Sequence, residues 1–207
     1  MSTWRKYAGP AGRWTDEAYA DADAYLAHRA ELVCTLGPAL APGDVVLDLA
    51  CGDGGLGDFL PEQRYIGVDA SPEMVAAAKK RGRDVIEADM NDFEPSERPR
   101  ATTMFRAVYY ARDRRALLTR IAGYTDTKVV FDLNPRQYSL REVRDDLVAA
   151  GFDNMRARPF FMPQSRSLGR PAARLLRVLE QTGFIARAVL RFRFTYLVAA
   201  WRSTDSR

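Results

Sequence analysis

The stretch 45–60 constrains the fold more than any other part of the chain. It opens with VVLDL, five residues that are apolar except for Asp48, and continues through ACGDGG to the apolar residues Leu56, Phe59 and Leu60. This order predicts a buried strand, a tight glycine turn and a short helix. Glycines let the backbone approach a ligand closely, and a helix N-terminus offers unpaired N–H groups. A glycine turn can also merely connect elements, so the neighbouring motifs decide whether a nucleotide binds here.

Length and composition fit one compact domain. The chain has 207 residues, of which 47% are hydrophobic and 28% charged. We expect a cytoplasmic protein, because no apolar run could span a bilayer and the first residues lack a secretory signal. Two cysteines and one histidine give no disulfide framework and no zinc cluster, so we expect no metal. The net charge of +4 is spread among 27 acidic residues and does not indicate a nucleic-acid partner.

Predicted strands and helices alternate along most of the chain. We predict strands at 45–49, 64–68, 84–87, 128–134, 155–161 and 189–201, with another at 102–104 that runs into a loop over 105–111. Helix starts are indicated by Ser71-Pro72, by Asp113 and by a capping box formed by Ser139 and Glu142. The alternation predicts an α/β fold, a mostly parallel Rossmann-like sheet with helices on both faces.

Residues 1–40 are predicted to form an N-terminal arm and a cap helix. One helix is expected from an N-cap at Thr15, and Tyr25, His28 and Arg29 then share a face. That face either packs on the sheet or closes a ligand pocket, and both interpretations stay open. His28 is expected to pack or to lie at the surface. Residues 41–207 are predicted to form the main domain.

A helical insert is predicted near 165–185. Within 168–181, Leu168, Ala172, Leu175 and Leu179 are expected on one face, with arginines beside them. We favour an ordinary surface helix. A helix that contacts an anionic membrane surface or covers an apolar substrate is the alternative.

Three acidic residues lie at the carboxyl ends of three successive predicted strands, namely Asp48, Asp69 and Asp89. Ligands of open α/β sheets bind at that edge. A carboxylate after the second strand suits the two ribose hydroxyls, and one after the third can accept a hydrogen bond from an exocyclic amine. The pattern predicts an adenosine site.

The segments VLDLACGDG (46–54), IGVDASPEMVAAAK (66–79) and EADMNDF (87–93) resemble the class I S-adenosylmethionine-dependent methyltransferases in order and spacing. The resemblance extends over about 43–201. It implies a seven-stranded sheet whose last strand is antiparallel. It also implies S-adenosyl-L-methionine as cofactor and S-adenosyl-L-homocysteine as product.

The resemblance also implies roles for residues in these segments. Ala50, Gly52 and Gly54 would pack against the methionine part, and Asp48 would anchor its amino group. Asp69 would hold the ribose, and Asp89 and Met90 would meet the adenine. Ala50 stands where many members have glycine. The further cofactor-binding candidates are Cys51, Ala70, Met74, Phe105, Tyr25 and Arg29.

Acceptor residues are expected in the loops after the fourth and fifth strands. Aromatic rings there suit a sulfonium through cation–π attraction. Tyr109 is the candidate catalytic residue, for substrate contact or proton acceptance, with a packing role as the alternative. The other substrate candidates are Tyr110, Arg106, Asn134 and Arg136. The sequence Asn-Pro-Arg-Gln-Tyr at 134–138 departs from the Asn-Pro-Pro-Tyr motif of methyltransferases acting on planar nitrogens and comes one strand later.

We therefore expect methyl transfer to a small-molecule acceptor, such as a secondary metabolite, an isoprenoid or a lipid-like compound, by in-line displacement. The alternatives are an RNA methyltransferase and a protein that binds the cofactor without methylating. A nicotinamide enzyme is a weaker alternative. Gly52-x-Gly54-x-x-Gly57 satisfies the dinucleotide fingerprint, and Tyr124 and Lys128 have reductase-like spacing. However, 124–128 is predicted as a loop entering a strand instead of a helix. The oligomeric state is not predicted.

Overall fold

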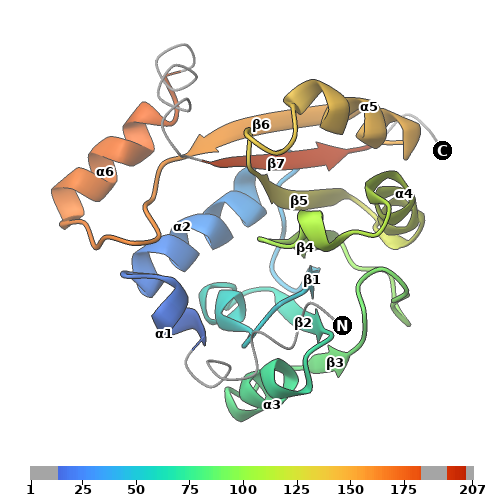
Figure 1. Cartoon of the computed structure of the whole chain (residues 1–207), viewed down its shortest axis with the longest axis horizontal. Coiled ribbons are helices and arrows are strands. Elements are labelled where there is room, and N and C mark those ends of the chain that lie inside the picture. Colours follow the sequence, from blue (N-terminus) through green and yellow to red (C-terminus); the bar gives the residue numbers. More distant parts are fainter. Residues whose placement is uncertain (1–13, 183–194, 204–207) are drawn as a thin grey trace.

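The computed structural model describes residues 14–182 and 195–203, and within them a seven-stranded sheet of order β3-β2-β1-β4-β5-β7-β6 (Figure 1). Strands β1 to β5 pair in parallel, and β7 runs antiparallel between β5 and β6. The predicted fold with its antiparallel last strand is confirmed. The bounds are β1 Val45–Leu49, β2 Arg64–Asp69, β3 Val85–Glu87, β4 Ala101–Met104, β5 Lys128–Leu133, β6 Asn154–Phe160 and β7 Thr195–Trp201. The part of the last predicted strand at 189–194 lies outside the described residues.

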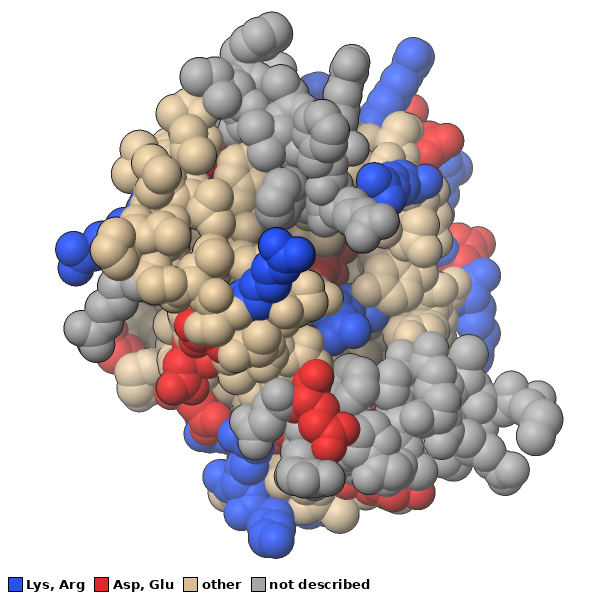
Figure 2. All heavy atoms as spheres, turned by 60° about the vertical axis from the view of Figure 1, so that its left-hand side comes forward, with Lys and Arg blue, Asp and Glu red and all other residues tan. Residues whose placement is uncertain are grey.

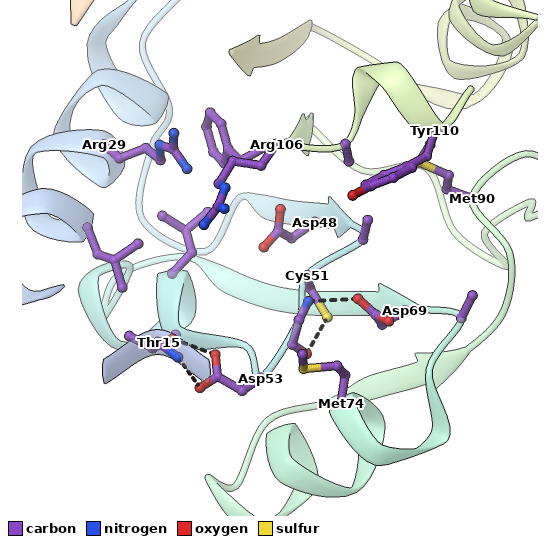
Figure 3. A pocket seen from close by; sticks show the side chains of 18 of the residues that line it. Thr15, Arg29, Asp48, Cys51, Asp53, Asp69, Met74, Met90, Arg106 and Tyr110 are labelled. Carbon is purple, nitrogen blue, oxygen red and sulfur yellow. Dashed lines mark hydrogen bonds between the residues drawn. The ribbon is translucent and has the colours of Figure 1, made fainter. Parts of the chain in front are cut away.

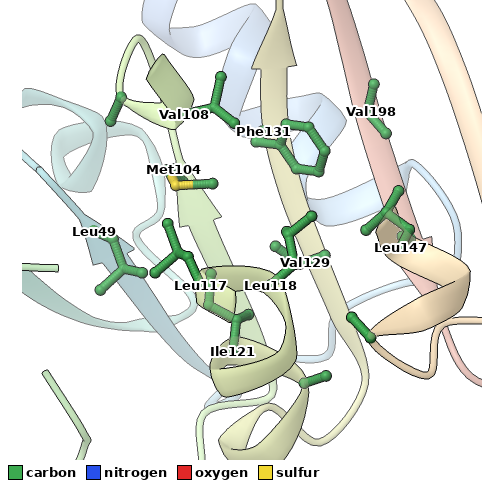
Figure 4. Close-up of a cluster of buried hydrophobic side chains, with 14 of the residues drawn as sticks. Leu49, Met104, Val108, Leu117, Leu118, Ile121, Val129, Phe131, Leu147 and Val198 are labelled. Atoms are coloured by element: carbon green, nitrogen blue, oxygen red, sulfur yellow. The ribbon is translucent and has the colours of Figure 1, made fainter. Parts of the chain in front are cut away.

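Helices cover both faces of the sheet, because successive strand residues point to opposite sides. The helices are α1 Trp14–Ala18, α2 Ala22–Thr35, α3 Pro72–Lys80, α4 Arg114–Tyr124, α5 Leu140–Ala149 and α6 Arg170–Leu179. Two short 3₁₀ helices are η3 Gly55–Phe59 and η4 Val108–Tyr110. Val46 and Val130 face α2, whereas Val129 and Phe131 face α4 and α5. Figure 4 shows this second cluster, in which Leu118 of α4 packs on the sheet.

The predicted helix starts are confirmed by their caps. Ser71 Oγ accepts a hydrogen bond from Met74 N, and Pro72 occupies the first turn of α3. Asp113 caps α4, and Ser139 with Glu142 forms the capping box of α5. Each cap satisfies N–H groups that the helix itself leaves without acceptors.

The single N-terminal helix predicted from Thr15 is wrong. The chain forms two helices instead, because the Asp21 side chain accepts from Ala24 N and starts α2 afresh. The Thr15 side chain does not cap a helix but donates to Asp53. Helix α2 ends at Thr35, where Lys128 Nζ donates to the carbonyls of three residues, Cys34, Leu36 and Pro38.

The short helix after the glycine turn is η3, a 3₁₀ helix of five residues. It begins after Gly54, whose φ is +72° and whose missing side chain leaves the first turn without a side-chain cap. A helix this short presents few aligned N–H groups. The predicted short helix is thus present as a 3₁₀ helix, and its part in binding a nucleotide stays a prediction.

Helix α6 is present where the insert was predicted, but its inward face differs from the prediction. Leu176 and Leu179 pack on Phe161, while Leu175 is 60% exposed. The Glu180 carboxylate at the end of α6 accepts from Phe161 N at 2.8 Å and lies 2.7 Å from Nε2 of the buried His28. These contacts fix α6 against α2. None of the helices in the described ranges has the length and apolar character needed to cross a membrane.

Candidate functional site at the carboxyl edge of the sheet

A cavity of about 430 Å³ lies at the carboxyl ends of the parallel strands. Its described lining comes from the ends of β1 and β2, from the loops after β3 and β4, and from α1 and α2. This volume is in the range of about 300–1,000 Å³ that small-molecule sites have. Figure 3 shows Asp69 and Tyr110 on one side, Arg29 and Thr15 on the other, and Asp48 between them.

The glycine turn after β1 holds a left-handed backbone at three positions. The φ angles are +55° at Ala50, +60° at Gly52 and +72° at Gly54. The turn is tied to the next strand by Asp69, whose Oδ2 accepts from Gly52 N at 2.8 Å and whose Oδ1 accepts from Ser71 N at 2.9 Å. These bonds fix the carboxylate at the cavity wall, and burial raises its pKa.

Asp48 is a buried carboxylate that lines the cavity from within β1. Its Oδ2 accepts from the Tyr65 hydroxyl at 2.8 Å and its Oδ1 from Thr103 Oγ1 at 2.6 Å. Burial raises its pKa to about 6, although both hydrogen bonds and Arg29 favour the charged form. Asp48 is therefore a site where a nearby cation would find compensating negative charge.

Asp89 lies at the far end of the cavity, after β3. Its Oδ1 accepts from the backbone and side-chain nitrogens of Asn91, and its Oδ2 pairs with Arg112 Nη2 at 2.7 Å. Burial acts to raise the pKa of Asp89, but these hydrogen bonds outweigh it and the pKa is lowered. Met90 beside it is buried.

Two arginines supply the positive charge of the cavity. Arg29, from α2, donates from Nη2 to Asp132 Oδ2 at 2.8 Å, and its guanidinium lies 4.2 Å from the Phe105 ring centroid. Its Nε is buried and has no hydrogen-bond partner. Arg106 has a φ of +54°, and its N–H donates to Asp132 Oδ1 at 2.6 Å. One buried carboxylate thus accepts hydrogen bonds from the Arg29 guanidinium and from the Arg106 backbone.

Helix α1 is attached to the glycine turn by Asp53. The Asp53 carboxylate accepts from the backbone N–H and the hydroxyl of Thr15 and forms an ion pair with Arg81 at 3.3 Å. A Cβ at Gly55 would collide with the Thr15 hydroxyl, so glycine is required there. Through these contacts Thr15 and Tyr19 join the cavity wall.

Most of the residues expected from the sequence come together in this cavity. Those that line it are Arg29, Asp48, Ala50, Cys51, Gly52, Asp69, Ala70, Met74, Asp89, Met90, Phe105, Arg106, Tyr109 and Tyr110. Lining residues that sequence reasoning missed are Thr15, Tyr19, Leu26, Asp53, Gly55, Leu56, Ala88, Asn91 and Ala107. The position of Asp53 in the turn and the run Gly54-Gly55 were the available signals for the contact with α1.

Four expected residues lie outside the lining. Tyr25 is buried behind Arg29, to which its hydroxyl is bonded at 3.0 Å. Gly54 faces Arg83 and Ala78, so it serves the turn and not the cavity. Asn134 and Arg136 form a tight turn after β5, in which Asn134 Oδ1 accepts from Arg136 N and leaves the Arg136 side chain exposed.

Tyr109 lines the cavity, and its part in the chemistry stays a prediction. Burial raises its pKa above the ordinary tyrosine value. Its ring meets Tyr110 edge-on, with centroids 5.4 Å apart. Tyr124 and Lys128, the pair with reductase-like spacing, are not among the described lining residues. Lys128 is buried, and its Nζ donates to a carbonyl at the end of α2.

The comparisons with known proteins agree with this geometry. A family model described as a methyltransferase domain matches residues 46–127. Trans-aconitate 2-methyltransferase of Mycobacterium tuberculosis is 37% identical over 112 residues, which are 48% of this chain and 42% of the relative. An uncharacterized methyltransferase of Schizosaccharomyces pombe is 49% identical over 45 residues, 21% of this chain and 17% of the relative. The chain spans less than half the length of the curated mycobacterial relatives that it matches.

Solved structures support the fold over nearly the whole chain. A complex between the Haloferax volcanii Trm112 methyltransferase activator and a putative methyltransferase matches with a TM-score of 0.68 and 18% identity, covering 99% of this chain and 97% of that chain. A possible histamine N-methyltransferase of Thermotoga maritima matches with a TM-score of 0.65 and 13% identity, covering 97% and 98%. At these identities the likeness concerns the fold alone.

Proposed function

We propose that this chain, whose residues 46–127 match a family model described as a methyltransferase domain, transfers a methyl group from S-adenosyl-L-methionine to a small-molecule acceptor. The observation that carries the proposal is the glycine turn bonded to Asp69 at the open edge of the sheet. The turn leaves its backbone accessible to a ligand, and the Asp69 carboxylate is held rigid beside it.

The charged groups of the lining fit this cofactor. In the proposal, Asp69 holds the ribose hydroxyls, and Asp89 with Met90 meets the adenine. Asp48 compensates the positive charge of the methionine amino group. Arg29 holds the methionine carboxylate, which would give its buried Nε the partner that it lacks in the protein alone.

The bound cofactor supplies a methyl group already activated on a sulfonium, so the protein's task is mainly to orient the acceptor and exclude water. Phe105 and Tyr109 present aromatic rings in the lining, and such rings attract a sulfonium. Helix α1, attached by Thr15 to Asp53, closes one side of the cavity. No group of the protein needs to form a covalent bond in this scheme.

A small molecule is favoured over RNA as the acceptor. The curated mycobacterial relatives are named for trans-aconitate, a small organic acid. Figure 2 displays acidic and basic side chains interspersed over the face it presents, with no continuous basic stripe among the described residues there. Recognition of RNA ordinarily uses such a stripe together with exposed aromatic rings.

Asp69→Asn tests the cofactor assignment. The carboxamide places an N–H₂ group against one of the two backbone donors and removes the charge that holds the ribose. Calorimetry with S-adenosyl-L-homocysteine is expected to give an affinity at least about tenfold weaker. Asp145→Asn is the matched control, because Asp145 is exposed on α5, away from the cavity. Circular dichroism verifies that each variant folds.

Equal affinity of Asp69→Asn and the wild type would contradict the proposed ribose site. Incubation of the wild type with methyl-labelled cofactor and the small-molecule filtrate of a bacterial extract tests transfer itself. Cofactor binding without any labelled product would instead support the alternative of a protein that binds the cofactor without methylating.

A further inference from the structure

We propose that the outer face of helix α6 binds an anionic membrane surface, so that the protein attaches to a lipid bilayer without crossing it. This face consists of Pro171, Ala172, Arg174, Leu175 and Val178, all of which are exposed. The sequence alone favours an ordinary surface helix at this place. Apolar side chains open to solvent, the charge of the surrounding sequence and the way in which α6 is held now favour the membrane-binding alternative.

The first observation is the apolar surface that α6 leaves uncovered. Leu175 is 60% exposed and Val178 is 59% exposed, the two highest values among the large hydrophobic side chains in the described ranges. These two residues are three apart in the helix and are therefore neighbours on its surface. Ala172 continues the same stripe toward the start of the helix. An aliphatic stripe of this kind can enter the boundary between lipid headgroups and acyl chains.

The second observation is an imbalance of charge in the sequence around α6. Residues 166–194 contain seven arginines and one acidic residue, so the other 178 residues contain 24 basic and 26 acidic residues. The chain's net charge of +4 therefore comes from this segment. Arg166 and Arg174 are exposed, whereas Arg177 forms an ion pair with Glu31 at 3.2 Å. The three arginines at 187, 191 and 193 lie outside the described residues. An excess of arginine attracts anionic lipid headgroups.

The third observation is that α6 is fixed to the fold, with its acidic residue turned inward. The Glu180 carboxylate accepts from Phe161 N at 2.8 Å, lies 2.7 Å from His28 Nε2 and belongs to a residue that is 3% exposed. Leu176 and Leu179 pack on Phe161. The segment 170–182 has no other acidic residue, so no carboxylate of this segment opposes the headgroups. Because the helix is already formed, binding does not incur the entropic cost of ordering a flexible segment.

Other partners fit the outer face of α6 less well. A twofold interface pairs a patch with itself, so a second copy of the chain would bring two arginine-rich surfaces together, and like charges repel. RNA is commonly bound by stacking its bases on aromatic rings, whereas this face carries aliphatic side chains. A lipid surface offers negative charge to Arg174 and apolar acyl chains to Leu175 and Val178. In Figure 1, α6 lies at the periphery of the described fold, where an extended surface can approach it.

Sedimentation with lipid vesicles tests membrane binding in the absence of cofactor and acceptor, so its result is independent of methyl transfer. The whole chain is mixed with vesicles of equal parts phosphatidylcholine and phosphatidylglycerol, or with vesicles of phosphatidylcholine alone. We expect binding to the anionic vesicles that weakens when NaCl is raised from about 0.05 M to about 0.5 M. Binding to the neutral vesicles should be much weaker. No binding to the anionic vesicles, or equal binding to both kinds, would overturn the proposal.

Val178→Glu tests whether the binding surface is α6, and Val148→Glu is the matched control. The two valines are almost equally exposed, at 59% and 58%, but Val148 lies on α5, among acidic and basic residues. We expect Val178→Glu to lower the partition onto anionic vesicles about tenfold or more, because an apolar side chain is lost and a repelled charge is gained. Val148→Glu should stay within about twofold of the wild type, since it lies away from the binding face. Circular dichroism verifies that both variants fold.

Arg174→Gln tests the charge, with Arg141→Gln on the exposed surface of α5 as its control. One arginine near an anionic membrane surface contributes about a factor of five, so Arg174→Gln should weaken vesicle binding by about that much. An equal loss in a variant and its control would overturn the assignment to α6.

Two further measurements separate the membrane from other partners of the same face. Light scattering after size-exclusion chromatography detects self-association, and a dimer that only Val178→Glu dissociates would overturn the proposal in favour of a second copy. Titration with labelled RNA detects nucleic-acid binding. Binding to RNA that is tighter than binding to the anionic vesicles, and that Val178→Glu abolishes, would also overturn it. We expect a wild type whose molar mass is unchanged by Val178→Glu and whose RNA binding is weaker than its vesicle binding.

Discussion

Replacing Asp48 by Asn is expected to stabilise the protein without ligand at neutral pH. Burial raises the pKa of Asp48 from 3.8 to about 6, a difference that corresponds to about 3 kcal/mol at about pH 7.5. The unfolded chain loses this proton first as the pH rises, so ionisation of Asp48 lowers the free energy of unfolding progressively between about pH 4 and about pH 6, and by the full amount above that. Asn has no such cost. The Asn side chain has an N–H₂ group where Asp has a second acceptor oxygen, so the hydroxyl of either Tyr65 or Thr103 must accept a hydrogen bond instead of donating one. This change costs about 1 kcal/mol, so the net gain in the free energy of unfolding is about 2 kcal/mol.

The pH dependence separates this ionisation effect from ordinary repacking. At about pH 4.5 the folded wild type keeps the Asp48 proton, and the cost of ionisation falls to about 1 kcal/mol, so the two proteins should be equally stable there. Urea unfolding at both pH values measures the difference, with Asp145→Asn as a control for an exposed position. The same variant should bind S-adenosyl-L-homocysteine more weakly, because it lacks the negative charge that Asp48 places near the amino group of the bound ligand. A variant that is less stable at about pH 7.5, or a difference independent of pH, would refute the reasoning.

Three further substitutions test individual contacts. Ala50→Gly should raise the free energy of unfolding by up to about 1 kcal/mol, because Ala50 has a φ of +55° and glycine adopts that conformation without the clash. A lower free energy of unfolding, measured in urea, would contradict the strain assigned to this turn. Lys128→Met should lower the free energy of unfolding by about 3 kcal/mol, because buried carbonyls at the end of α2 lose their donor. A variant as stable as the wild type would show that these hydrogen bonds do not stabilise the protein. Thr15→Val removes the hydrogen bond from the Thr15 hydroxyl to the charged Asp53 side chain. We expect this loss to speed the dissociation of S-adenosyl-L-homocysteine about threefold or more in stopped-flow experiments. An unchanged dissociation rate would mean that α1 does not close the site.

Local signals predicted most of the fold. The caps at Ser71, Asp113 and Ser139 accept from N–H groups only three residues away, so their spacing is enough to identify them. The break between α1 and α2 could not be found in this way. Thr15 and Asp21 are both residue types that cap helices well. Thr15 instead contacts Asp53, which lies 38 residues away in the sequence, and Asp21 caps α2.

The candidate site was predictable where it depends on strand ends. Asp48, Asp69 and Asp89 meet because parallel strands bring their carboxyl ends to one edge of a sheet. The orientation of Arg106 was not predictable, because no sequence pattern indicates a left-handed backbone at an arginine. The same holds for Arg136, which became a candidate through its position after β5 and which a tight turn leaves exposed to solvent.

A crystal structure of the protein with S-adenosyl-L-homocysteine tests whether the cavity at the carboxyl edge of the sheet is the cofactor site. We predict the nucleoside in the cavity between the glycine turn and Asp89, with the Asp69 carboxylate about 3 Å from the ribose hydroxyls. Density for the ligand elsewhere would contradict it, and so would a cavity that takes up a nicotinamide dinucleotide in preference to the adenosyl compound.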